Sequence, residues 1–152
     1  MKKNARGFTL VELLATVTII AILVGMAIPL ARNSIKRERE QDLRNALREM
    51  RTAIDKYKEA ADAGKVEVPT DTEGYPQTLD ALVDGVQLIG QAGKNIKFLR
   101  KIPIDPMTNS TDWGMRSYQD ETNSQSWGGQ NVFQVYSKSE GVAFDGTRYK
   151  DW

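Results

Sequence analysis

One carboxylate near the start of a long apolar stretch constrains this chain more than any other feature. Basic residues Lys2, Lys3 and Arg6 precede the stretch, which runs from Phe8 to Ala31 and contains a single charged residue, Glu12. The uncharged run after Glu12 is about 19 residues long, just enough for a helix to cross a bilayer. Because positive residues stay on the cytoplasmic side, we expect a single-pass segment with the rest of the chain outside the inner membrane.

Two simple interpretations of this stretch leave part of it unexplained. A cleaved secretory signal would have a shorter apolar run and small residues at its far end, where this chain has Ala27-Ile28-Pro29. An uncleaved membrane anchor accounts for the basic residues and the hydrophobicity, but it gains nothing from Glu12. A carboxylate in a membrane segment costs several kcal/mol unless it has a partner, which marks Glu12 as a functional residue.

A third interpretation accounts for both the charge and its spacing. Cleavage between Gly7 and Phe8 would create a new α-amino group at Phe8, and Glu12 lies four residues further along the same helical face. The carboxylate could then neutralise an N-terminal ammonium group, most simply that of a neighbouring subunit. Two charges in an apolar filament core are tolerable only as a pair.

The string Arg6-Gly7-Phe8-Thr9-Leu10-Val11-Glu12 resembles the class III signal of type IV pilins and type II secretion pseudopilins. The resemblance implies that a prepilin peptidase cleaves after Gly7 and methylates the new N-terminus at Phe8. It also implies that Glu12 supports assembly. Pro29 matches the position at which the family commonly has a helix-kinking proline, and it is assigned to assembly on that basis.

The role of Pro29 has two interpretations when the residues are considered alone. Proline and glycine are common in membrane helices generally, so Pro29 and Gly25 need have no special role. Alternatively, Pro29 removes an amide donor and loosens the helix around Gly25, which would help a subunit leave the bilayer and pack into a fibre.

The composition excludes several classes of function. The chain has no cysteine and no histidine, so it has neither disulfides nor thiolate metal sites, and it lacks the commonest general base. We therefore expect a protein that is not an enzyme. Its 21 basic and 20 acidic residues nearly balance, and glutamates are interleaved with the arginines of residues 32–51. A DNA-binding face needs uncompensated positive charge, so no nucleic acid partner is expected.

The helix should continue beyond the apolar stretch, because residues 32–62 contain no glycine or proline. An apolar stripe with helical spacing runs along this part, and Gly64 should end the helix. The apolar residues of this part are Ile35, Leu43, Leu47, Met50, Ile54, Tyr57 and Ala61, and the stripe runs from Leu43 onward. The predicted divisions are a leader (1–7), a transmembrane and filament-core helix (8–31), its amphipathic continuation (32–62) and a globular periplasmic head (63–152).

The sequence of the head predicts short elements joined by loops. We predict a short helix over residues 76–85, a loop over 90–97, and a proline-fixed extended path over 98–106. Residues 113–119 and 132–137 alternate enough to predict antiparallel strands. The aromatic residues that crowd the last forty positions are expected to build the core of the head.

The head also resembles that of the major pseudopilin of type II secretion. The shared features are a proline step at Ile102–Pro106, a W-G-x-x-Y strand at Trp113–Tyr118, and an Asp145-Gly146 turn before Asp151-Trp152. The chain departs from the family where Met107–Asp112 separates the proline step from the W-G strand. Some members bind calcium in the last loop, which points to Asp145 and Asp151 as ligands. Asp145 could instead simply form an Asp-Gly turn, and Asp151 could cap a helix or pair with a lysine.

Together these features predict an α+β, pilin-like fold, with a long helix and a small antiparallel sheet packed on its second half. The resemblance implies a structural subunit of a type II secretion pseudopilus that needs no cofactor. Its partners would be copies of itself, the prepilin peptidase, an inner-membrane assembly platform and minor pseudopilins. A subunit of a surface type IV pilus and a membrane-anchored periplasmic binding protein are the competing possibilities.

Overall fold

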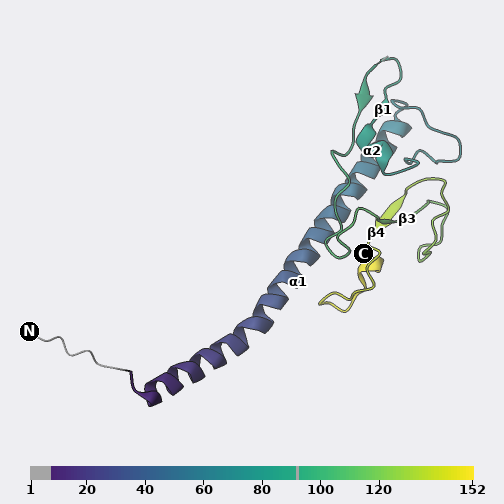
Figure 1. Ribbon diagram of the computed structural model, residues 1–152. Coiled ribbons are helices and arrows are strands. Elements are labelled where there is room, and N and C mark those ends of the chain that lie inside the picture. The colour runs from purple at the N-terminus through teal and green to yellow at the C-terminus, as the bar shows by residue number, and fades with distance from the viewer. Residues whose placement is uncertain (1–7, 92) are drawn as a thin grey trace, which may run out of the picture. The chain divides into compact units, whose positions relative to one another are not determined.

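A computed structural model describes residues 8–91 and 93–152, with the backbone alone for residues 26–32 (Figure 1). The predicted leader, and with it Gly7, lies outside the described residues. The chain divides into two compact units, one ending at Glu38 and the other comprising Arg39–Trp152. Each unit is described separately below.

The longest element is α1, Leu10–Asp62, which agrees with the predicted helix over both of its parts. The helix ends where the sequence predicts, because Gly64 adopts a left-handed backbone with φ of 64°. The amide of Lys65 donates to the carbonyl of Ala60 at 2.9 Å, which closes the final turn.

The first unit exposes its apolar side chains. Eleven large apolar residues between Phe8 and Val24 are each between 53% and 74% exposed. Within the residues that the structure describes, no helix meets the length and hydropathy expected of a membrane span. Ile35, which comes before the predicted stripe, belongs to this unit and is also 52% exposed.

The second unit has one hydrophobic core, built on the later turns of α1. The residues of the apolar stripe, from Leu43 to Ala61, are all at most 7% exposed, as predicted. Side chains from the rest of the unit cover this stripe and complete the core. They include Val66, Leu79, Leu82, Leu99, Trp113, Val132, Val135 and Tyr149.

A short helix and a small hairpin follow α1. The helix, α2, spans Asp80–Asp84, which is shorter than predicted, and Gly85 ends it with φ of 88°. Strand β1, Val86–Gln87, pairs antiparallel with β2, Asn95–Ile96. The predicted loop over 90–97 is therefore partly wrong. Two-residue strands are too short to show alternation, and their pairing depends on the turn between them.

The second sheet joins the two segments that were predicted as strands. Strand β3, Gly114–Arg116, pairs antiparallel with β4, Gln134–Tyr136, and Gly114 lies opposite Tyr136. Both strands are shorter than predicted, but the pairing is confirmed. The chain closes with a 3-10 helix, η1, Tyr149–Asp151.

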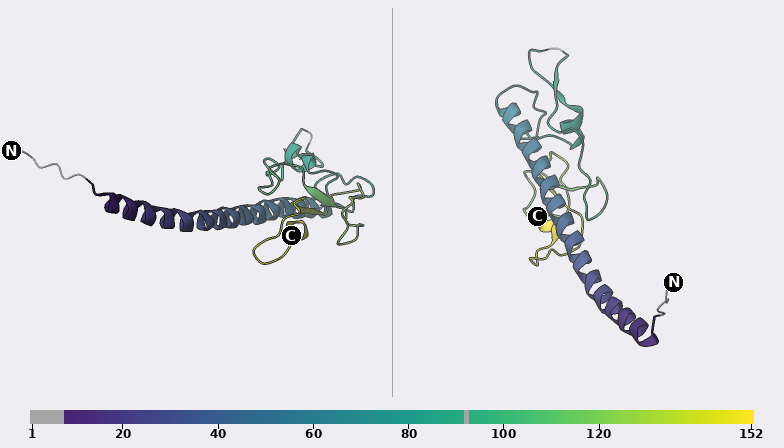
Figure 2. Two further views of the ribbon diagram at one scale, coloured as in Figure 1. Left: turned by 60° about the horizontal axis from the view of Figure 1, so that its bottom comes forward. Right: turned by 90° about the vertical axis from the view of Figure 1, so that its left-hand side faces the viewer.

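The fold class is confirmed as α+β, with a long helix followed by small antiparallel sheets. In two orientations, the segment after α1 surrounds the end of the helix, while the last loop lies further back along it (Figures 1 and 2). The expectation that the late aromatic residues all build the core is partly wrong. Trp113 and Tyr149 are buried, whereas Tyr118, Phe133 and Phe144 are between 42% and 58% exposed.

Candidate functional site

The first turn of α1 carries the residues that the sequence assigns to processing and assembly. Thr9 stands immediately before the helix, and its hydroxyl oxygen accepts a hydrogen bond from the amide of Glu12 at 3.3 Å. Its carbonyl accepts the first helical bond, from the amide of Leu13 at 3.1 Å. Thr9 is thus the N-cap of α1 and satisfies one of the amides that a helix start leaves unpaired.

This cap defines the position of Glu12 in the helix. The spacing Thr-x-x-Glu places Glu12 at the third helical position, the place of the acidic residue in a capping box. A carboxylate there lies next to the positive end of the helix dipole. Sequence reasoning identified Glu12 by its charge but missed Thr9, although the T-x-x-E pattern directly before an apolar run was a readable signal for it.

The polar side chains that follow Glu12 are satisfied within the helix. The hydroxyl of Thr16 donates to the carbonyl of Leu13 at 2.8 Å, and that of Thr18 donates to the carbonyl of Leu14 at 2.7 Å. Such bonds let threonine lie in an apolar helix without an outside partner. Among residues 8–91 and 93–152, by contrast, no cation forms an ion pair with the exposed Glu12 carboxylate.

The remaining predicted assembly residues are placed only in part. Phe8 immediately precedes the cap, with its side chain 73% exposed. Gly7 is outside the described residues. α1 includes position 29, but the side chain of Pro29 is also outside what the structure describes.

The predicted calcium ligands lie in separate surroundings. One oxygen of Asp145 accepts hydrogen bonds from the amide and hydroxyl of Thr147, at 2.9 and 2.6 Å, and the other pairs with Arg44 at 3.2 Å. The Thr147 bonds, helped by the Arg44 charge, lower the pKa of Asp145. Asp145 therefore forms the turn that was its other predicted role.

Asp151 lies in η1 and lines a different cavity, together with Lys138 and Lys150. In the described part of the chain, no three acidic side chains gather as a metal site would require. Calcium binding at Asp145 and Asp151 stays a prediction, and the geometry does not bring the two residues into one site.

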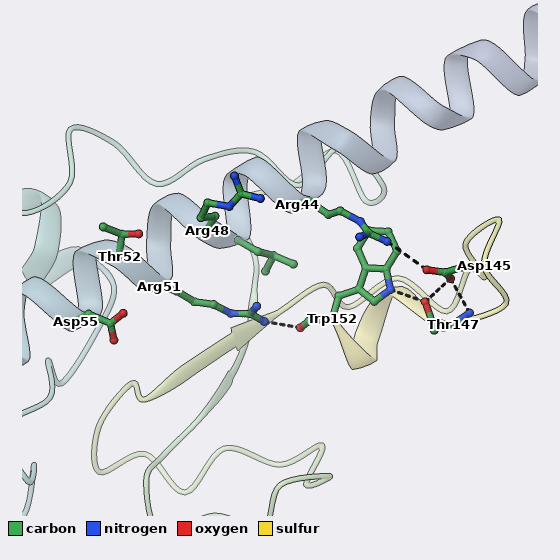
Figure 3. A pocket seen from close by; sticks show the side chains of 9 residues that line it. Arg44, Arg48, Arg51, Thr52, Asp55, Asp145, Thr147 and Trp152 are labelled. Atoms are coloured by element: carbon green, nitrogen blue, oxygen red, sulfur yellow. Dashed lines mark hydrogen bonds and ion pairs between the residues drawn. The ribbon is translucent and has the colours of Figure 1, made fainter.

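Asp145 instead borders a cavity of about 590 Å³ beside α1 that sequence reasoning missed (Figure 3). Three arginines one turn apart line it, namely Arg44, Arg48 and Arg51. The guanidinium of Arg44 stacks on the indole of Trp152 at 4.1 Å. Arg51 donates to the carbonyls of Trp152 and Val135, at 2.5 and 3.3 Å, and its burial lowers its pKa.

Comparison with known proteins defines the class of the N-terminal segment. Residues 2–28 match the prokaryotic N-terminal methylation motif, a match that includes Gly7, Phe8 and Glu12. The chain thus carries the N-terminal methylation motif that the resemblance implied.

Curated relatives extend this likeness over part of the chain. Three type IV major fimbrial proteins FimA from Dichelobacter nodosus are each 44% identical to it over 55 residues, which is 36% of this chain. The matched segment spans about a third of the length of these relatives, 34% or 35%. No solved structure is significantly similar to the chain.

Proposed function

We propose that this chain is the subunit of a periplasmic or surface filament and that it polymerises through the first part of α1. One observation carries the proposal: a carboxylate without a described partner stands on the capped first turn of a helix whose apolar side chains are exposed. An apolar surface of this extent must be covered by lipid or by protein. The proposed role is structural, with no chemistry performed by the subunit.

Processing would supply the missing cation. Cleavage after Gly7 leaves the α-amino group of Phe8 one residue before the Thr9 cap, and N-methylation keeps its positive charge. In the filament core, this ammonium group would pair with Glu12 of a neighbouring subunit. The pair neutralises two charges that would otherwise be costly to remove from water.

The remaining proposed features follow from this role. Before assembly, residues 8–31 would cross the inner membrane once, with the leader in the cytoplasm and the head in the periplasm. The prepilin peptidase, an assembly platform in the inner membrane and minor pseudopilins would be its partners. Pro29 would assist the transfer from membrane to fibre by weakening the local helix.

Two kinds of filament are supported by different observations. The proline step, the W-G strand and the Asp145-Gly146 turn favour a type II secretion pseudopilus, which drives folded proteins out of the cell. The similarity to type IV major fimbrial proteins favours a surface pilus. Deleting the gene separates them, since loss of protein secretion supports the first and loss of surface fibres or surface motility supports the second.

The processing step is tested by mass spectrometry of the mature protein. We expect a chain that begins at a methylated Phe8. An intact leader would overturn the proposal and would favour a membrane-anchored binding protein.

The charge pair is tested by Glu12→Gln, which keeps the size of the side chain and removes its charge. We expect normal cleavage and membrane insertion but no fibres in sheared fractions. Glu49→Gln is the matched control, because Glu49 is an exposed carboxylate of the same helix outside the apolar stretch. Fibres of Glu12→Gln at the control level would contradict the proposed pairing.

A further inference from the structure

The arginine cavity has one cation that its own subunit does not use. Arg44 forms an ion pair with Asp145 and stacks on the indole of Trp152. Arg51 donates hydrogen bonds to two backbone carbonyls. Arg48 lies between them along α1 and, within the described parts of the chain, has no ion-pair or hydrogen-bond partner (Figure 3).

The chemistry of the cavity suits a carboxylate. A guanidinium group presents parallel N–H donors that match the two oxygens of a carboxylate. Thr52 also lines the cavity, and its hydroxyl group could donate to a bound carboxylate. Asp55 and Asp145 are the acidic side chains in the lining, so with three arginines the lining side chains carry one net positive charge.

The same unit carries an acidic segment at its other end. Residues 66–93 contain five acidic residues and no lysine or arginine. Two of them, Asp71 and Glu73, are exposed and adopt left-handed backbone conformations, with φ of 68° and 53°. Residues other than glycine rarely adopt this backbone conformation, and they keep it only where the surrounding structure stabilises it.

The anchor of this loop is Thr72, which lies between the two acids. Its side chain is 1% exposed, and its hydroxyl donates to the carbonyl of Pro69 at 2.9 Å. The amide of Tyr75 in turn donates to the carbonyl of Thr72 at 3.0 Å. The loop therefore presents Asp71 and Glu73 to solvent on a fixed backbone.

The cavity and the loop cannot meet within one subunit. The backbone at Gly74 lies against Lys58, which is ten residues after Arg48 on α1 and so about 15 Å along the helix axis. Figures 1 and 2 show the same separation, with the segment after α1 at the end of the helix and the last loop further back. Two complementary surfaces at different places on one unit make a heterologous contact, which repeats into an open filament when the rotation between copies does not close a ring.

We propose that the acidic loop Asp71–Glu73 of one copy docks into the arginine cavity of a second copy, with Arg48 as the partner of the incoming carboxylate. This inference rests on the proposed polymerisation and names a contact between heads that accompanies it. The Glu12 pair would join the N-terminal helices, and this second contact would set the stacking of the heads.

Disulfide crosslinking tests the contact directly, because the full chain has no native cysteine. The double variant Arg48→Cys/Asp71→Cys is expressed in cells that assemble the fibre and is then oxidised. We expect a ladder of crosslinked multimers, since each copy offers both halves of the contact. Arg48→Cys/Lys101→Cys is the matched control, with an exposed second position outside the acidic loop, and should give no ladder.

The outcomes separate this contact from the proposed function. Fibres that form but give no ladder, or give the same ladder as the control pair, overturn the docking of loop and cavity while polymerisation stands. A crosslinked dimer from either single-cysteine variant would also overturn it, because one cysteine per chain can pair only across a symmetric contact. If no variant and no wild-type chain forms fibres, the proposed function itself fails.

Charge reversal provides a second test that does not depend on cysteine chemistry. Arg48→Glu and Asp71→Arg should each lower fibre yield by about tenfold, the scale of losing one interfacial charge pair. Combining them restores the attraction in the opposite sense and should recover most of the yield. Single variants with wild-type yield, or a double variant no better than the worse single one, would contradict the contact.

Discussion

At the scale of single residues, the Thr9 cap is the structural detail on which the placement of Glu12 depends. Replacing an N-cap hydroxyl with an apolar side chain costs a helix about 1 kcal/mol. Thr9→Val should therefore fray the first turn, leave Glu12 less well oriented and reduce fibre yield. Thr9→Ser keeps the hydroxyl and should assemble like the wild type. Immunoblots of cleaved and uncleaved protein would separate a defect in assembly from one in processing.

Tyr149 should make the stability of the second unit sensitive to alkaline pH. Its hydroxyl donates to the Glu40 carboxylate at 2.9 Å, and burial together with this bond raises the pKa of Tyr149 to about 12. The usual tyrosine pKa is near 10, so the folded state holds the proton more tightly than the unfolded chain. The stabilisation is complete below pH 10 and is lost as the pH rises toward 12.

The substitution Tyr149→Phe tests this dependence. It removes the titrating hydroxyl but keeps the ring that packs edge-on against Trp152. Urea unfolding between pH 9 and pH 12 should show a shallower loss of stability for the variant than for the wild type. If both proteins lose stability equally between pH 9 and pH 12, Tyr149 does not contribute to the loss of stability at alkaline pH.

At the scale of elements, the β3–β4 sheet depends on a glycine. A Cβ atom at Gly114 would lie 2.3 Å from the ring of Tyr136, its partner in the register. The ring could move only by disturbing the guanidinium of Arg116, which stacks on it at 4.1 Å. Gly114→Ala should therefore destabilise the second unit by about 1–3 kcal/mol in thermal unfolding, whereas Thr111→Ala, at an exposed position nearby, should have little effect.

A buried carboxylate holds the proline step to the residue that follows β4. Asp105 is fully buried, and its side chain accepts hydrogen bonds from the hydroxyl of Ser137 at 2.6 Å and the amide of Met107 at 2.7 Å. Asp105→Ala would leave both donors buried without a partner, at a cost of about 3 kcal/mol. Ser137→Ala removes one donor and should cost less, as chemical denaturation would show. Wild-type stability in both variants would indicate that the step is held by packing alone.

At the scale of the whole molecule, the second unit has a core of its own and should fold without the first. A fragment of residues 39–152 is expected to melt cooperatively, followed by circular dichroism. Leu47→Ala should lower its stability by about 2–5 kcal/mol, because Leu47 is only 2% exposed. Glu12→Gln in the full chain should leave that transition unchanged, so that its effect on fibres is one of assembly and not of folding.

The amino-acid sequence by itself determined the long helix, its end at Gly64, the buried stripe and the special status of Glu12. These features depend on local or periodic properties: the 3.6-residue repeat, a helix-ending glycine, and a charge where none is expected. The methylation motif is likewise a short contiguous string of residues.

Only the tertiary structure decided which side chains from distant parts of the chain meet. The turn from Asp145 to Thr147 joins Arg44 across about a hundred residues, and Asp105 meets Ser137. Arg48, between two arginines that have partners, has none among the residues that the structure describes. No local pattern encodes such contacts, because they arise when the later segments fold back on the helix. For the same reason, the pairing of Asp145 with Arg44 could not be read from the sequence.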